Sequence, residues 1–259
     1  QGGNGGQVEV SGKQNLGFDG KVDTTAAHGK TGTLLLDPSI INIASAGTDD
    51  AQVGDGQVLF ADGGAGTFVI SPTAINAVGA TVTLQATSQI NVNNAVTMTT
   101  AGAGLILQSQ GLIALSSSIT TNNGVITLTA TGTTITLGNN VDLNAGTAAV
   151  TLSSPGTITI DNGSDITGGV VSISSGGNLL ENGNINGSTS ITLAAGTDGT
   201  GDLTFPTNNR FLTSPSISLR AGDGAGGTNT ATAAAGNTNI TYRGGGGAGT
   251  APTTLSFRQ

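Results

Sequence analysis

The chain has 259 residues, of which 44 are glycine and only 8% are charged, and its formal net charge at pH 7 is −8. The seven basic residues are scattered, which argues against nucleic acid and anionic membrane surfaces as partners because both are bound through clustered positive charge. No apolar run is long enough to predict a membrane-spanning helix. Cysteine is absent, which excludes disulfides and thiolate sites.

A pair of apolar residues with i, i+2 spacing returns about every 22 residues along the chain. This spacing places both side chains of a pair on one face of a β-strand. The pairs in this first column are Val8/Val10, Leu34/Leu36, Val58/Phe60, Val82/Leu84, Leu105/Leu107, Ile126/Leu128, Val150/Leu152, Val171/Ile173, Ile191/Leu193 and Ile217/Leu219.

Two further apolar columns run in step with the first. The second column contains Leu16/Phe18, Ile41/Ile43, Phe68/Ile70, Ile90/Val92, Ile113/Leu115, Ile135/Leu137, Ile158/Ile160, Leu180 and Leu203/Phe205. The third column contains Val96, Ile119, Val141, Ile166 and Ile185. Three columns predict an all-β, right-handed parallel β-helix of about 10 coils, each with roughly 22 residues and three short strands.

The predicted β-helix covers residues 1–220, with a loop or short hairpin leaving it near 44–57. Residues 221–259 are rich in glycine and alanine and predict a continuation with less regular coils. No helix of usual length is predicted. Asn and Gly tolerate positive φ and predict tight turns at 122–124, 139–140, 162–163, 182–183 and 186–187.

Residues 5–14 (GGQVEVSGKQ), 22–24 (VDT) and 29–38 (GKTGTLLLDP) carry more than periodicity, as do 72–74 (PTA) and 82–86 (VTLQA). Over about residues 5–92, these segments resemble the filamentous-haemagglutinin-like large exoproteins. The resemblance implies a secreted or surface-displayed bacterial adhesin. It implies a shaft segment downstream of the secretion domain, and export of the parent protein through an outer-membrane transporter.

Few residues in the sequence are candidates for catalysis. The single histidine, His28, lies in a turn-like segment and is too isolated for a zinc site. A Ser–His–Asp triad is compatible with the composition, but we interpret His28 as a solvent-exposed, inert loop residue. Asp142 and Asp165 are about one coil apart and could stack on one face, as a polysaccharide-cleaving β-helix would require. We interpret these two residues, with Asp161 and Glu181, as solvated acids at corners, and we expect no enzymatic activity.

Two other kinds of site are candidates. Asp49, Asp50, Asp55 and Asp62 lie among glycines and are weak candidates for calcium, which prefers several oxygen ligands. No other cofactor is expected. Asn162, Asn186 and Asn239 begin glycan acceptor sequons, although Asn-Gly also suits a tight corner. A complete ladder of Thr-x-Thr pairs could order water and bind ice. Because the pairs are not repeated on every coil, we interpret them as ordinary outward strand positions, at Thr81/Thr83, Thr127/Thr129 and Thr157/Thr159.

The sequence therefore predicts a structural and adhesive role. Outward Thr, Ser, Asn and Gln form a neutral polar face suited to glycans or proteins on host or neighbouring cells. One alternative is a subunit of an extracellular filament that associates end to end, because uncapped solenoid ends pair edge to edge. A second alternative is a polysaccharide-cleaving enzyme.

Overall fold

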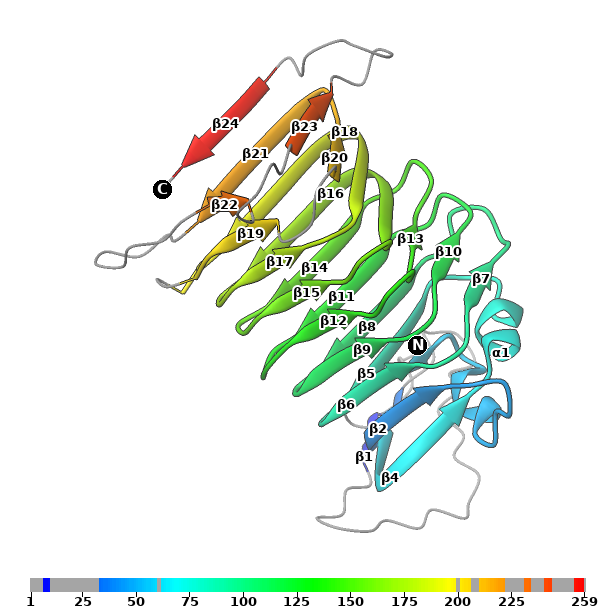
Figure 1. Ribbon diagram of the computed structural model, residues 1–259. Coiled ribbons are helices and arrows are strands. Elements are labelled where there is room, and N and C mark those ends of the chain that lie inside the picture. The colour runs from blue at the N-terminus through cyan, green and yellow to red at the C-terminus, as the bar shows by residue number, and fades with distance from the viewer. Residues whose placement is uncertain are drawn as a thin grey trace, which may run out of the picture.

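The computed structural model describes residues 7–9, 33–59, 62–198, 201–205, 210–221, 231–233, 240–243 and 254–258. Strands make up 54% of the chain and helices 6%, so the fold is all-β. Among the described residues the strands pair in parallel, and successive turns stack into a rod (Figure 1). The predicted parallel β-helix is confirmed, with about 7 turns where about 10 were expected.

From residue 82 onward, each turn places a strand, or half of a long strand, on each of three sides. The first side contains β3 (Gln57–Val58), β5 (Val82–Ala86), β8 (Leu105–Ser109), β11 (Ile126–Ala130), β14 (Val150–Ser154), the second halves of β16 (Asp165–Ser175) and β18 (Asn184–Ala195), β21 (Ser216–Ala221) and β24 (Thr254–Arg258). The third side contains β7 (Val96–Met98), β10 (Ile119–Thr121), β13 (Leu143–Asn144), the first halves of β16 and β18, β20 (Arg210–Thr213) and β23 (Ile240–Arg243).

The second side forms a separate sheet. From the middle of the rod to its C-terminal part it contains β6 (Gln89–Val92), β9 (Leu112–Leu115), β12 (Ile135–Leu137), β15 (Ile158–Ile160), β17 (Leu179–Glu181), β19 (Leu203–Phe205) and β22 (Ala231–Ala233). At the N-terminal end it contains β1 (Gln7–Glu9), β2 (Thr33–Ile43) and β4 (Asp62–Ile70).

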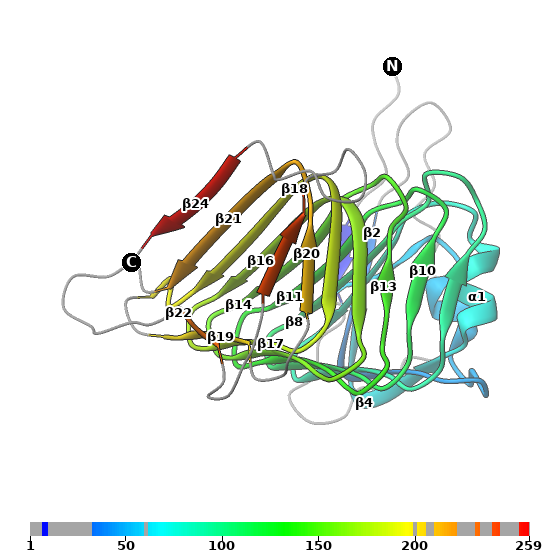
Figure 2. The ribbon, with the colours of Figure 1, turned by 45° about the horizontal axis from the view of Figure 1, so that its top comes forward.

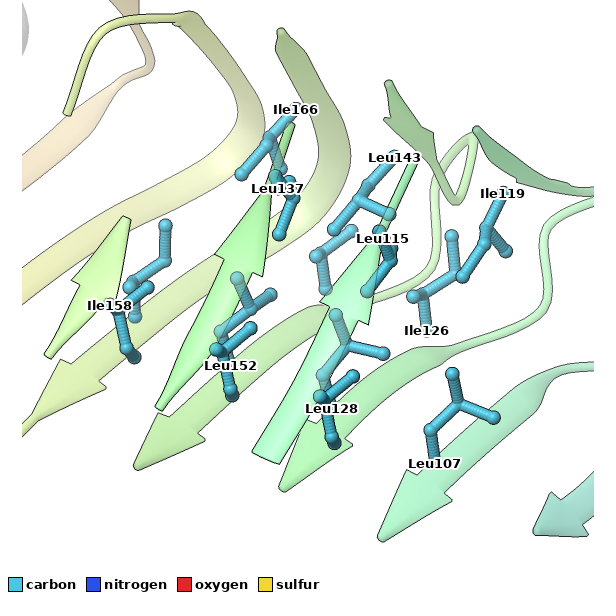
Figure 3. Packing of buried hydrophobic residues seen from close by; sticks show 14 of the residues in the cluster. Leu107, Leu115, Ile119, Ile126, Leu128, Leu137, Leu143, Leu152, Ile158 and Ile166 are labelled. Atoms are coloured by element: carbon cyan, nitrogen blue, oxygen red, sulfur yellow. The ribbon is translucent and has the colours of Figure 1, made fainter. Parts of the chain in front are cut away.

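Apolar side chains from all three sides fill the interior (Figure 3). Leu107, Leu128 and Leu152 occupy equivalent positions on neighbouring first-side strands, and all three are fully buried. The outward neighbours Thr127 and Thr151 are half-buried, as the alternation of a strand requires. From Val82 to Leu219 the first-column pairs are in the register that the sequence predicts.

Glycine is required where the chain turns from the first side to the second. A Cβ added at Gly111, Gly132 or Gly156 would lie 1.9 Å from a carbonyl oxygen of the preceding turn. Successive turns can therefore approach closely at this corner only without a side chain. This close approach accounts for part of the high glycine content.

The predicted Asn-Gly turns are only partly confirmed. Asn123 and Asn140 adopt φ of 57°, and Gly163 adopts φ of 77°. Gly187 lies instead inside β18, opposite an irregularity in β16 between Gly168 and Val170. The prediction of a turn at 186–187 is therefore wrong.

Strand order is rearranged at the N-terminal end. The sequence predicts that residues 41–43, 68–70 and 90–92 follow one another in the second column. Instead β2 lies between β4 and β6, because Ile41 is in register with Phe68 on one edge and with Ile90 on the other. The later strand β4 is thus placed outside the earlier strand β2 (Figure 1).

This rearrangement corrects the first column before Val82. Residues 34–43 form one strand on the second side, so Leu34/Leu36 does not precede Val58 on the first side. Val58 is in register with Leu84 rather than Val82, a shift of two residues. These early pairs do not mark separate turns, which is one reason why the turns are fewer than predicted.

One inward position on the third side also differs. The sequence predicts Val141 in this column, but the residue in register with Ile119 and Ile166 is Leu143. Val141 is buried two residues earlier, and its N–H donates to Ser164 Oγ at 3.0 Å. Both residues satisfy the alternating pattern, so the sequence alone selected the wrong one.

Two short helices lie at the N-terminal end. The 3-10 helix η1 (Asp50–Val53) follows β2, and the α-helix α1 (Pro72–Ala77) follows β4. Ser71 caps α1, because its Oγ accepts from the N–H of Ala74 at 3.1 Å. In Figures 1 and 2, α1 lies beside β7 on the third side, where Asn76 Oδ1 accepts from the N–H of Thr99 at 2.8 Å.

Candidate functional site

The acidic residues proposed for calcium are used in hydrogen bonds that shape the N-terminal end. Asp49 Oδ2 accepts from the N–H of Val69 and from Thr48 Oγ1, both at 2.8 Å. Asp55 Oδ1 accepts from the N–H of Gln57 at 3.1 Å. The side chain of Asp62 lies outside the described residues.

Asp50 joins the two short helices. Its Oδ1 accepts from the N–H of Ser71 at 2.5 Å, and its Oδ2 accepts from Ser71 Oγ at 2.7 Å. Ser71 is only 6% exposed and caps α1, so one carboxylate holds η1 against the start of that helix. Within the part of the chain that the structure describes, no group of three or more His, Cys, Asp or Glu side chains is arranged to hold a metal ion.

Asp142 and Asp165 do stack in neighbouring turns, as their spacing predicts. They lie at the corner that opens the third side, and both are exposed. Asp142 Oδ1 accepts from the N–H of Asp165 at 2.9 Å, and Asp165 Oδ1 accepts from the N–H of Asn184 at 3.2 Å. Asn184 Oδ1 accepts in turn from the N–H of Phe211 at 3.1 Å. We call this row of acceptors, Asp142, Asp165 and Asn184, the Asx ladder.

The Asx ladder supplies backbone acceptors from one turn to the next. Each carboxylate or amide oxygen satisfies an N–H near the start of the following third-side strand. Asn184 Nδ2 also donates to Asp165 Oδ1 at 2.8 Å. The ladder therefore stabilises the fold, and its surface is the most acidic part of the described third side.

Glu181 differs from the other acids. Its side chain is fully buried, and it is in register with Ile160 at an inward position of the second side. Its Oε1 accepts from the N–H of Gly183 at 2.7 Å. The prediction of a solvated corner acid is wrong for Glu181. The spacing Leu179/Glu181, which repeats Ile158/Ile160, is the signal that could have placed it.

The two described sequons present different surfaces. In the first, Asn162 is exposed but Ser164 is buried, and its Oγ donates to the carbonyl of Gly138 at 2.8 Å. In the second, Asn186 and Ser188 are both exposed on β18. The third acceptor, Asn239, lies outside the described residues, as does His28.

A continuous row of uncharged polar side chains follows the third side. Its members are outward and are in register from β7 to β20. We call this row the third-side row, and it consists of Thr97, Thr120, Asn144, Thr167, Asn186 and Thr213. Hydroxyls and amides in this arrangement offer both donors and acceptors along the rod.

The Thr-x-Thr pairs lie outward on the first and second sides. Thr127 and Thr129 flank the buried Leu128, and Thr157 and Thr159 flank the buried Ile158. Thr81 and Thr83 flank Val82 in the same way. On the first side these hydroxyls belong to a wider outward surface that sequence reasoning did not identify, because it appears only when the strands are placed in register.

Comparisons with protein families, with curated proteins and with solved structures found no match. Among the described residues, no helix has the length and apolarity needed to cross a membrane.

Proposed function

We propose that the chain is a structural and adhesive shaft segment of a secreted or cell-surface bacterial adhesin of the filamentous-haemagglutinin-like type. The observation that carries the proposal is the uninterrupted stack of parallel turns, with neutral polar rows on its outside. Residues 5–14 and 29–38 add support through their resemblance to that group. The proposal includes no catalytic step, and it includes export of the parent protein through an outer-membrane transporter.

The proposed mechanism is mechanical. Parallel ladders run along the rod axis, so pulling along that axis loads many backbone hydrogen bonds, while bending compresses a packed core. Such a rod holds contact surfaces away from the cell. The third-side row would then bind glycans or proteins through hydrogen bonds, weakly at each turn and repeatedly along the rod.

The binding part of the proposal is tested on a glycan array and on host cells, using fluorescent beads coated with the purified 259-residue chain. A Thr120→Glu/Thr167→Glu variant introduces two carboxylates into the third-side row. A Thr136→Glu/Thr159→Glu variant makes the same charge change on the second side and is the matched control. We expect binding by the wild type and the control, and at least a tenfold loss for the third-side variant. Equal binding by both variants would contradict the proposed role of the third-side row.

The alternatives have separate readouts. Electron microscopy of the purified chain distinguishes discrete short rods, which the shaft proposal predicts, from thin fibres of unlimited length. Incubation with acidic and neutral polysaccharides tests the enzymatic alternative. Product formation that Asp142→Asn or Asp165→Asn abolishes would replace the shaft proposal with a lyase or hydrolase.

A further inference from the structure

The outward surface of the first side carries three rows of side chains, which are small or β-branched except for Gln85 and Gln108 at the N-terminal end of one flanking row. We call it the first-side face, and it spans β5, β8, β11 and β14 with the second halves of β16 and β18. Its middle row contains Ile106, Thr127, Thr151, Ser172 and Thr192 in continuous register. A row on one flank contains Thr129, Ser153 and Ser174, which are in register on neighbouring strands.

The other flanking row contains the exposed large hydrophobic residues of the described chain. Val125 is 37% exposed and Val170 is 39% exposed. Each directly precedes an equivalent inward residue, Ile126 or Val171, and Ala149 occupies the same place before Val150. The three side chains therefore follow one another on successive turns. Single exposed apolar residues need no explanation, but stacked ones form a patch, and patches mark interaction sites.

The first-side face is also uncharged. From Thr83 to Ala194 no outward position of its described strands carries an acidic or basic side chain, although the chain has a net charge of −8. The exposed acids Asp142 and Asp165 lie on the third side. Two copies of the chain repel each other overall because both are acidic. At this face they can approach without placing like charges opposite each other.

We propose that the first-side face is a lateral docking surface for a second copy of this chain, related to the first by a twofold axis. An axis parallel to β14 and passing over Ala149 places that residue opposite its own copy. The same axis places Val125 of each chain opposite Val170 of the other. Apolar side chains and threonine methyl groups would then be removed from water at the centre of the contact.

The size of the face sets the expected strength. Six strands about 4.8 Å apart and three rows about 7 Å apart give a plane of about 30 Å by 15 Å. Two copies packed on this plane would bury about 1,000 Å² in total, which is at the low end of specific interfaces. The isolated dimer should therefore be weak, and many rods anchored side by side would populate it through their high local concentration.

Other occupants fit the face less well. It carries no aromatic side chain on which a sugar ring could stack and no basic row for a polyanion. Val125, Ala149 and Val170 lie in one row and most hydroxyls lie in the other two, and an axis parallel to the strands places each row opposite the same row of the second copy. Self-complementarity of this kind is what a twofold interface needs.

Sedimentation velocity of the 259-residue chain at rising concentration, up to about 1 mM, tests the proposal. Thr151→Lys places two ammonium groups opposite each other across the proposed axis. Thr159→Lys makes the same charge change on the second side and is the control. We expect reversible dimers for the wild type and for Thr159→Lys, and at least a tenfold weaker dimer for Thr151→Lys. Circular dichroism and thermal unfolding verify that both variants are folded.

A cross-linking experiment locates the contact. The natural chain has no cysteine, so Ala149→Cys and Thr159→Cys each introduce a single thiol. A short bifunctional maleimide should cross-link Ala149→Cys into a covalent dimer and leave Thr159→Cys largely monomeric. Added salt should strengthen the dimer, because it screens the repulsion between two acidic rods. A wild type that remains monomeric, or a Thr151→Lys variant that associates normally, would overturn the proposal.

Discussion

Leu128 illustrates how the position of one residue is fixed by its neighbours along the rod. It is fully buried between Leu107 and Leu152, whereas the adjacent Thr127 lies half-buried on the outside. One backbone step thus separates an apolar environment from a hydrated one. A charged residue should therefore destabilise the fold much more at position 128 than at position 127.

Replacement of Leu128 by Asp should sharply destabilise the fold, by about 3–5 kcal/mol, because it buries a carboxylate without a partner. Thr127→Asp should cost less than about 1 kcal/mol, because its carboxylate reaches water. Thermal unfolding followed by circular dichroism gives the comparison. Equal losses at the two positions would contradict the assignment of inward and outward faces.

Gly132 gives a second prediction at the residue scale. A Cβ at this position would lie 1.9 Å from the carbonyl oxygen of Gln110, whereas a Cβ at Gly66 would meet nothing within 4 Å. Gly132→Ala should therefore lower the free energy of unfolding by about 2 kcal/mol or more, because the backbone of two turns must separate. Gly66→Ala should leave it unchanged or raise it slightly. Chemical denaturation measures both, and a stable Gly132→Ala protein would argue against the close approach at this corner.

At the scale of elements, the corners are held by side-chain acceptors. In the Asx ladder, oxygen atoms of Asp142, Asp165 and Asn184 each accept a backbone N–H from the following turn. A corner can therefore remain solvent-exposed while its backbone is satisfied. The charge of the two carboxylates is not needed for this role, because the amide oxygen of Asn184 accepts the equivalent backbone hydrogen bond.

Asp165→Ala should consequently lower the free energy of unfolding by about 1–2 kcal/mol, because it removes the acceptor of two hydrogen bonds from Asn184. Asp165→Asn keeps the acceptor and removes the repulsion with Asp142, so its stability should equal or exceed that of the wild type. Urea denaturation distinguishes the variants. If Asp165→Asn were as unstable as Asp165→Ala, the carboxylate charge would be the important property.

At the scale of the whole molecule, the placement of β2 between β4 and β6 determines how the rod begins. Asn42 is in register with Val69 on one edge and with Asn91 on the other, and Asn91 Nδ2 donates to Asn42 Oδ1 at 2.8 Å. The amide pair lies on the outside of the second side. Its existence depends on the rearranged strand order.

Paired cysteines test this order directly. Residues on adjacent strands are about 4.8 Å apart, within the range for a disulfide, whereas residues two strands apart are about 9.6 Å apart and too distant. Asn42→Cys/Asn91→Cys should therefore form a disulfide under mild oxidation, and Val69→Cys/Asn91→Cys should not. Mass spectrometry after digestion identifies the bond. The reverse result would restore the sequential order of strands.

Sequence reasoning predicted the fold class and most of the register after Val82, because each turn there repeats the same apolar pairs. It failed before Val82, where the residues of β2 fit two short strands as well as one long strand. A pattern of alternation identifies strands but not their neighbours. The acidic residues illustrate the same limit. Asp50 accepts hydrogen bonds from Ser71, and Glu181 is buried. Composition alone predicts neither role.

The position of β4 outside β2 also suggests a direction in which the rod assembles. Residues 36–43 of β2 are covered by β4 on one edge, and the opposite edge offers residues 40–43 to β6. If the chain winds up from its N-terminal end, β4 already covers one edge of β2, and the other edge of β2 is open to β6. Each later strand would then dock on the strand placed before it, and we expect winding to proceed toward the C-terminal strands.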